Sequence, residues 1–314
     1  MLWASDMEFK HYSVLARECI EYLDIKPDGI YVDCTLGGAG HTSLILSRLG
    51  ANGRIIGIDR DNDALANAAQ KINDSRFTAV KSNYEDVADV LENLGIEKAD
   101  GFLFDLGVSS YQLDTPERGF SYINDAPLDM RMDTSGGITA YDVVNTYSES
   151  ELARIIFEYG EDKFSRRIAS RIVRERENAP IENTLRLAEI ISAAVPNQSK
   201  SGGHPAKRAF QAIRIEVNGE LASIGKAIES AADKLKVGGR IAVISFHSLE
   251  DRIVKNTFAK LASPCICPKD FPVCMCNKVA NVKIITKHPV LPTEEELNEN
   301  SRSHSAKLRV AEGI

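Results

Sequence analysis

The chain of 314 residues lacks the features that mark membrane, secreted and disulfide-stabilised proteins. No apolar run approaches the roughly 20 residues of a membrane span, and the start of the chain lacks the basic and apolar regions of a signal peptide. Six cysteines are too few for a disulfide scaffold in a chain of this length, so reduced thiols or a metal site are expected. These absences predict a globular protein of the cytoplasm that has no membrane association.

Several motifs of nucleotide and hydrolase sites are also missing. The sequence has no G-x-G-x-x-G, which argues against a nucleotide-dependent oxidoreductase, and no P-loop lysine follows its glycine cluster. A catalytic serine would need a sharp G-x-S-x-G turn, and no such turn surrounds Ser245 or Ser248. We therefore expect the neighbouring His247 to be a hydrogen-bonded structural or substrate-contact residue and not a catalytic base.

The charge of the chain is unevenly distributed. A net charge of −7 argues by itself against a nucleic-acid binder, because Lys and Arg make the contacts to phosphate. Residues 151–214, however, contain twelve Lys and Arg against eight Asp and Glu, a balance of +4 that leaves −11 for the rest of the chain. A basic insert in an acidic protein is predicted.

Residues 30–59 are predicted to form a strand, a glycine-rich turn, a helix and a second strand, which together make one βαβ unit. The turn has the pattern D-x-T-x-G-G-A-G, which suits a nucleoside without a pyrophosphate, and Asp59 at the end of the second strand can accept both hydroxyls of a ribose. S-adenosylmethionine is such a ligand, and its amino-acid end is expected against the backbone of Ala39, Gly40 and His41. The alternative is an ordinary turn in an α/β core.

Strands and helices continue to alternate up to residue 107, a pattern typical of a doubly wound parallel sheet with ligands beyond the carboxyl ends of its strands. Asp33, Asp59 and Asp105 all fall at such ends, which favours a shared site over three separate helix caps. Tyr84 follows the third strand, where it is expected to stack on a base or to be a half-buried loop residue.

The second half of the chain is predicted to hold a helical insert and the rest of the sheet. Residues 108–133 have no clear period and are expected to form a long structured loop, interpreted as a lid over the strand ends. Residues 141–196 are predicted to be helical, with Thr184 as one cap and Pro196 as a stop. A fifth strand is expected after a turn at Gly238 and Gly239, and residues 282–287 and 305–312 are expected to complete seven strands.

Two groups of side chains within this half allow opposing interpretations. Spacings of four, four and three place four basic residues on one helix face, where they either contact phosphates or form a solvated surface: Lys163, Arg167, Arg171 and Arg174. Four cysteines form a C-x-C, six residues and a second C-x-C: Cys265, Cys267, Cys274 and Cys276. Four such thiols can supply a tetrahedral zinc site, but this spacing is tighter than the usual two-residue knuckle, so unligated thiols are favoured and no metal ligand is assigned.

Segments spread over nearly the whole chain together resemble the bacterial 16S ribosomal RNA cytosine-N4 methyltransferase family, of the MraW or RsmH type. They are HYSVL, DCTLGGAGH, IDRD, DLGVSSYQLD, ERGFS, PLDMRMD, HPAKRAFQAIRIEVNGEL and ISFHSLEDRIVK. The resemblance implies a class I, Rossmann-like S-adenosylmethionine-dependent methyltransferase core at residues 1–115 and 213–314. It also implies an inserted, mostly helical RNA-substrate domain at residues 116–212, acting on N4 of a cytosine in the decoding region of 16S rRNA within the small ribosomal subunit.

The resemblance further implies which residues contact the methyl donor, S-adenosylmethionine. These are Ala39, Gly40, His41, Asp59, Tyr84, Asp105 and Gln112. Ala39 and Tyr84 stand where the family commonly has Gly and Phe, both mild changes, and the four-cysteine segment is absent from some members. A homodimer is one alternative for the assembly.

The chemistry of an amine acceptor suggests one catalytic residue. Cytosine N4 shares its lone pair with the ring, so a hydrogen-bond acceptor must pull on the hydrogens of the amine and favour a tetrahedral nitrogen. Asp105 is the candidate for this acceptor. The alternative is that Asp105 only holds the methyl donor or the loop. Methylation at carbon 5 would instead need a cysteine that attacks the ring, and Cys34 inside the donor turn is badly placed for that. The alternative function is a catalytically silent RNA-binding ribosome-assembly factor that retains the donor fold.

Overall fold

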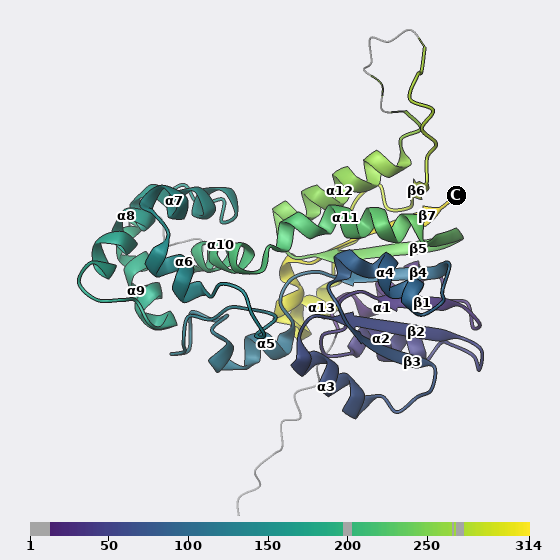
Figure 1. Cartoon of the computed structure of the whole chain (residues 1–314), viewed down its shortest axis with the longest axis horizontal. Coiled ribbons are helices and arrows are strands. Elements are labelled where there is room, and N and C mark those ends of the chain that lie inside the picture. Colours follow the sequence, from purple (N-terminus) through teal and green to yellow (C-terminus); the bar gives the residue numbers. More distant parts are fainter. Residues whose placement is uncertain (1–12, 197–202, 266, 268–272) are drawn as a thin grey trace, which may run out of the picture. The chain divides into compact units, whose positions relative to one another are not determined.

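The computed structural model of the protein describes residues 13–196, 203–265, 267 and 273–314. The chain divides into two compact units, whose elements are labelled in Figure 1. The first unit contains the residues up to 59, residues 64–106 and residues 226–314, and the second contains residues 60–63 and 107–225. The predicted insert, residues 116–212, lies inside the second unit, which begins earlier and ends later than that range.

The described part of the first unit is built on a seven-stranded sheet with the order β3-β2-β1-β4-β5-β7-β6. Its strands are β1 Ile30–Asp33, β2 Arg54–Asp59, β3 Phe77–Lys81, β4 Ala99–Asp105, β5 Leu235–Ser245, β6 Val282–Ile284 and β7 Lys307–Gly313. The strands β1 to β5 pair in parallel, whereas β7 pairs antiparallel with both β5 and β6. This confirms the predicted doubly wound sheet, and the strand order reverses between β1 and β4, where such sheets bind ligands.

Helices cover the central strands of this sheet, which are apolar on both faces. The helices of this unit are α1 Ala16–Leu23, α2 Gly40–Leu46, α3 Asn62–Lys71, η1 Tyr84–Asp86, α4 Val87–Asn93, α11 Glu220–Asp233, α12 Ser248–Ala262, α13 Glu294–Glu299 and η4 Ser301–Ser305. Cys19 of α1 and Ile45 of α2 pack with Tyr31 and Leu103 in one buried cluster. Since β4 is buried at every residue from Ala99 to Phe104, it contacts helices on both of its faces.

The start of β5 differs from the prediction. The strand was expected after a turn at Gly238 and Gly239, but it begins at Leu235 and runs through both glycines. Gly238 has φ +75°, and the pairing with β4 shifts register between Ala99 and Gly101. The glycine pair therefore forms an irregularity inside a strand, because a residue with positive φ can interrupt a ladder without ending it.

The second unit is helical. It contains α5 Ser110–Asp114, η2 Pro116–Arg118, α6 Ala140–Thr146, α7 Glu149–Glu158, α8 Ser165–Arg176, α9 Thr184–Ala194 and α10 Ala206–Asn218. Its described residues form no strand beyond an isolated bridge between Pro127 and Asn183, as predicted. Buried side chains of α7 to α10 share one core, which also takes in Leu128 and Met130 from the long loop. That loop is thus part of the packing of this unit, and its interpretation as a lid stays a prediction.

Two details of the helix starts were predicted wrongly. Asn183, and not Thr184, is the N-cap of α9, because its side chain accepts a hydrogen bond from the Arg186 N–H. The hydroxyl of Thr184 instead donates to the Asn124 carbonyl across the fold. Lys163 precedes α8, which begins at Ser165, so it is not on the face of that helix. Among the described helices, none has the length and apolarity to cross a bilayer.

Candidate active site

Three carboxyl groups lie at one edge of the sheet. Asp33, Asp59 and Asp105 are the last residues of β1, β2 and β4. Because these strands are parallel neighbours in the order β2-β1-β4, their carboxyl ends meet at the same edge. The structure therefore brings together the acids that the sequence predicted at the strand ends.

The turn between β1 and α2 contains residues with positive φ, and Asp59 accepts a hydrogen bond from the backbone of this turn. Gly37 has φ +46° and Ala39, a buried non-glycine residue, has φ +60°, so both occupy the left-handed region. The Gly37 N–H donates to Asp59 Oδ2 at 2.8 Å. Left-handed φ costs a residue with a Cβ about 1–2 kcal/mol, and such strain persists where surrounding contacts define the turn.

Gly38 and Gly40 of this turn lie in different surroundings. A Cβ at Gly38 would meet no atom within 4 Å, so packing inside this structure does not demand a glycine there. A Cβ at Gly40 would collide with the Ser13 hydroxyl, so a larger residue there would force the Ser13 side chain to rotate. The open space beside Gly38 is what a turn needs if its backbone is to approach a ligand.

His41, the second residue of α2, is buried and linked at both ring nitrogens. Nε2 lies 3.0 Å from the Val14 carbonyl oxygen, and Nδ1 lies 3.5 Å from Asp105 Oδ2. A carbonyl oxygen can only accept, so Nε2 must carry a proton. The nitrogen that faces Asp105 is therefore Nδ1, which has no proton of its own in the neutral ring. A hydrogen bond between Nδ1 and the Asp105 carboxyl needs a proton either on a charged imidazole or on the carboxyl.

Asp105 has a partly exposed side chain, of which 27% is accessible to solvent, and a carboxyl group with a raised pKa. The pKa is raised to about 6: burial is the main cause, the charge of His41 acts against it, and the charges of Asp33 and Glu250 act in the same direction as burial. Asp105 Oδ1 is buried and has no hydrogen-bond partner, whereas the backbone N–H donates to Thr35 Oγ1 at 2.6 Å. A buried, unpartnered carboxylate oxygen at a strand end is an acceptor that a ligand can satisfy.

Asp33 differs from Asp105 although it lies on the adjacent strand. Its oxygens accept from the Thr42 hydroxyl at 2.7 Å and from the Thr35 N–H at 3.2 Å. Burial still raises its pKa, against these hydrogen bonds. Asp33 thus links the turn to α2 through hydrogen bonds. Thr35 and Thr42 support this arrangement, and neither was predicted from the sequence, although the motif DCTLGGAGH contains Thr35 and is directly followed by Thr42.

Tyr84 opens η1, directly after β3, and is half-buried. Its ring meets the Phe104 ring of β4 edge to face, with centroids 6.2 Å apart and planes at 84°. This contact fixes the side chain from one edge. Tyr84 therefore stands at the same edge of the sheet as Asp59 and Asp105.

Comparisons with known proteins agree with this geometry. Residues 8–314 match the MraW methylase family. The chain belongs to this family. A protein of Clostridioides difficile named "Ribosomal RNA small subunit methyltransferase H" is 57% identical over 98% of this chain and 100% of its own length. A relative of the same name from Carboxydothermus hydrogenoformans is 54% identical over 98% of this chain and 99% of its own.

Membership of the MraW methylase family makes the protein a methyltransferase whose donor is S-adenosylmethionine, so the predicted family, fold, activity and cofactor are confirmed. The residues present fit this donor, because a Cβ at Gly38 would meet no atom within 4 Å and the turn therefore has room for a ligand beside its backbone there. The individual donor contacts remain predictions.

Gln112 lies in the second unit and is held by protein groups. It completes a capping box with Ser109 at the start of α5, and its amide nitrogen donates to Asp61 Oδ2 at 2.7 Å. Its side chain is buried. These hydrogen bonds explain the residue without a ligand, and its assignment to the donor stays a prediction.

Arg118 is the centre of this buried cluster, and the sequence analysis gave it no role. Its guanidinium lies 3.0 Å from Asp61 and 3.1 Å from Asp63, and it also donates to the Met132 carbonyl. The segments IDRD and ERGFS contain Asp61 and Arg118, but nothing in the sequence pairs the two segments. Arg118 is 55 residues away from its partner Asp63. His247 is the N-cap of α12, where its Nδ1 accepts a hydrogen bond from the Glu250 N–H at 3.4 Å. This agrees with the structural alternative for His247, and contact with a substrate stays a prediction.

Proposed function

We propose that this protein transfers a methyl group from S-adenosylmethionine to N4 of a cytosine in the decoding region of 16S rRNA, within the small ribosomal subunit. The observation that supports this chemistry is the partly buried Asp105 carboxyl with its unpartnered Oδ1 at the end of β4. The choice of RNA follows the relatives, which are named for ribosomal RNA of the small subunit. We place the reaction in the cytoplasm, where ribosomes are assembled.

The donor would be held at the edge of the sheet by residues of three elements. Asp59 would accept the ribose hydroxyls, the backbone of Ala39, Gly40 and His41 would face the amino-acid end, and the Tyr84 ring would flank the base. Bound there, S-adenosylmethionine supplies an electrophilic methyl group on a positively charged sulfur. The protein's task is then to hold an amine in line with that group, and orientation of this kind is worth roughly 7–11 kcal/mol of a barrier.

Asp105 would accept a hydrogen bond from the amine. With a pKa of about 6 it is mainly ionised at neutral pH, and it is basic enough to take part in moving a proton. Its Oδ2 is turned toward His41, and Oδ1 has no protein partner. His41, tethered to Val14, would keep the carboxyl in this orientation. Because protein atoms cover Oδ1, the carboxyl would have to turn for this oxygen to accept from the amine.

The burial of Cys34, inside the turn after β1, favours N4 over carbon 5 of cytosine as the target. Carbon-5 methylation needs a thiolate that attacks the ring. Burial raises the pKa of the Cys34 thiol well above its ordinary value, so this cysteine stays protonated and enclosed. A cysteine of this kind is inert as a nucleophile.

The second unit would bind the RNA through the exposed part of α8. Arg166, Arg167 and Arg174 are exposed and fall within an arc of about 100° on the helix. No carboxylate of the described chain is within ion-pair distance of these three, whereas Arg171 pairs with Glu175 at 2.8 Å. Phosphate groups are the partners that three uncompensated guanidinium groups favour.

Labelled methyl transfer tests the proposed substrate. Small subunits from a strain that lacks this protein should accept label from S-adenosylmethionine, and subunits from the parent strain should not, because their target is already methylated. Equal labelling of the two preparations would contradict the proposal. Absence of labelling in both would support the alternative of a silent assembly factor. Light scattering of the purified protein would distinguish a monomer from a homodimer.

A further inference from the structure

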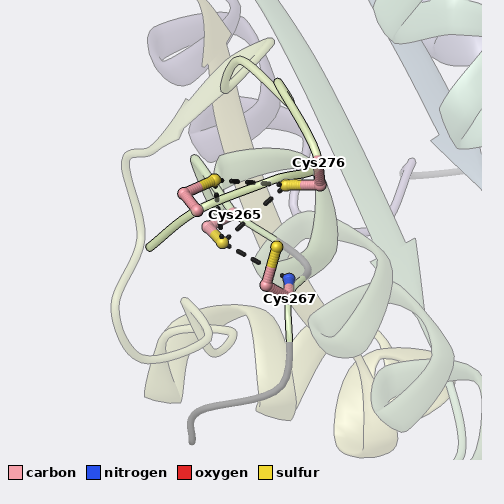
Figure 2. Close-up of side chains that lie close together, drawn as sticks. Cys265, Cys267 and Cys276 are labelled. Carbon is pink, nitrogen blue, oxygen red and sulfur yellow. Dashed lines mark hydrogen bonds between the residues drawn. The ribbon is translucent and has the colours of Figure 1, made fainter. Parts of the chain in front are cut away.

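Four of the six cysteines gather in the segment between α12 and β6 of the first unit. These are Cys265, Cys267, Cys274 and Cys276, which come from two C-x-C pairs. Figure 2 shows Cys265, Cys267 and Cys276 with their sulfur atoms turned toward one another. The remaining two cysteines, Cys19 and Cys34, are buried elsewhere in the fold.

The sulfur atoms are spaced as ligands of one ion. The distance is 3.4 Å from Cys265 to Cys274, 3.5 Å from Cys274 to Cys276 and 3.7 Å from Cys276 to Cys265. All four sulfurs lie within 4.8 Å of one another. Thiolates bound to zinc at about 2.3 Å occupy the corners of a tetrahedron whose edges are about 3.8 Å, whereas a disulfide would hold two sulfurs at about 2.05 Å.

Apolar packing does not explain why these residues converge. Among the described residues beside them, apolar side chains are largely exposed, with 69% of Val273, 76% of Met275 and 75% of Val279 accessible to solvent. The apolar surface that these described residues bury is too small to offset the conformational entropy of ordering them. Another interaction must hold Cys274 and Cys276 against Cys265 and Cys267.

Backbone groups are already directed at the sulfurs. The Cys267 N–H lies 3.3 Å from Cys265 Sγ, and the Met275 N–H lies 3.3 Å from Cys267 Sγ. Hydrogen bonds of this kind orient metal-bound ligands and offset the charge of a thiolate. Lys278, which binds the carbonyl oxygens of Leu261 and Ser263, closes the same segment onto the end of α12 and brings a positive charge to it.

We propose that Cys265, Cys267, Cys274 and Cys276 bind a zinc ion that ties the two C-x-C pairs together. Each thiol gives up its proton on binding, and the four thiolates close the coordination sphere, as in structural zinc sites. Tetrahedral sulfur sites suit zinc or iron. Zinc has no redox chemistry, and its role here is to fold this segment and not to take part in methyl transfer.

Metal analysis of the full-length protein tests this site. Protein purified under reducing conditions and exposed to zinc chloride, then desalted, should retain about one zinc per chain. The double variant Cys274→Ser, Cys276→Ser should retain less than about a tenth of that, because two ligands are removed. The matched control is Met275→Ser, which changes an exposed side chain between the same two cysteines and should keep the full zinc content.

Two further measurements decide between the alternatives. Cobalt substituted for zinc should give the intense visible absorption of a tetrahedral thiolate site in the wild type and in Met275→Ser, but not in the double variant. Donor binding by the double variant should stay unchanged, which shows that its first unit is folded. Iron in place of zinc, a wild type that holds no zinc after loading, or two disulfides among these four cysteines, found by mass spectrometry in protein purified without a reductant, would each overturn the proposal.

Discussion

Asp105 Oδ2 lies 3.5 Å from Nδ1 of His41, and the other nitrogen of the same ring lies 3.0 Å from the Val14 carbonyl oxygen. This arrangement fixes one oxygen of the carboxyl against a protein group and leaves Oδ1 buried without a partner. His41 is therefore a positioning residue for Asp105. Variants of Asp105 and of the residues around it separate a catalytic role from a purely structural one.

Replacement of Asp105 by Asn keeps the shape of the side chain and weakens its acceptor. Asp105→Asn should lower kcat by about 10²- to 10⁴-fold, which is typical of a group that handles a proton, and should leave donor affinity unchanged. Single-turnover kinetics and calorimetry measure the two quantities. A fall in donor affinity that matches the fall in kcat would make Asp105 a donor ligand and not the catalyst.

The raised pKa of Asp105 predicts a pH dependence with opposite signs for stability and activity. Folding raises this pKa from 3.8 to about 6, so the protonated carboxyl stabilises the fold fully below the unfolded value and loses that contribution as the pH rises through about 6. Across the same interval kcat should rise, because the ionised form is the acceptor. Denaturant unfolding and kcat measured against pH should show neither trend in Asp105→Asn. If Asp105→Asn keeps the wild-type pH dependence, another group causes it.

Asp59 is predicted to bind the donor's ribose. Asp59→Ala should weaken S-adenosylmethionine binding by about 1.5–3 kcal/mol, the range for hydrogen bonds to a charged group, as measured by calorimetry. Because Asp59 also accepts from the Gly37 N–H, Asp59→Asn is the informative companion, since its amide oxygen can keep that contact. Asp74→Asn, in a surface pair with Arg76, is the control. Wild-type affinity in Asp59→Ala would remove the assignment.

The exposed arginines of α8 are predicted to bind RNA phosphates. Reversing Arg167 and Arg174 to Glu should flatten the slope of log affinity against log salt by roughly 0.7–0.9 for each phosphate that the helix no longer neutralises. Arg186→Glu is the matched control, because Arg186 is already paired with Glu175 at 2.6 Å. If the reversed helix keeps the wild-type slope, the surface is merely solvated.

Arg118 is predicted to hold the second unit together. Arg118→Ala removes the cation from a buried pair with Asp61, a change that typically costs about 3–5 kcal/mol of unfolding free energy. Arg131→Ala breaks a more exposed pair with Asp129 and should cost about 0–1 kcal/mol. Denaturant unfolding of the two variants compares these values, and equal costs would contradict a special role for Arg118.

The sheet could be predicted from sequence because local pattern determines it. Apolar strands that alternate with amphipathic helices indicate a doubly wound sheet, and the position of Asp105 follows from the end of one apolar run. The cap at Asn183 could not be predicted, since it depends on Thr184 bonding to Asn124, a contact 60 residues away in sequence. The same holds for Arg118 and for the four cysteines, whose spacing in sequence argued against a metal until their positions in space were known.

The nature of the product tests the central proposal most directly. Small subunits from the deficient strain would be treated with the protein and S-adenosylmethionine, and their 16S rRNA digested to nucleosides for mass spectrometry against authentic standards. We expect N4-methylcytidine, formed by the wild type and strongly reduced with Asp105→Asn. A 5-methylcytidine product would contradict the proposal, because no described cysteine near the strand ends is placed to attack the ring.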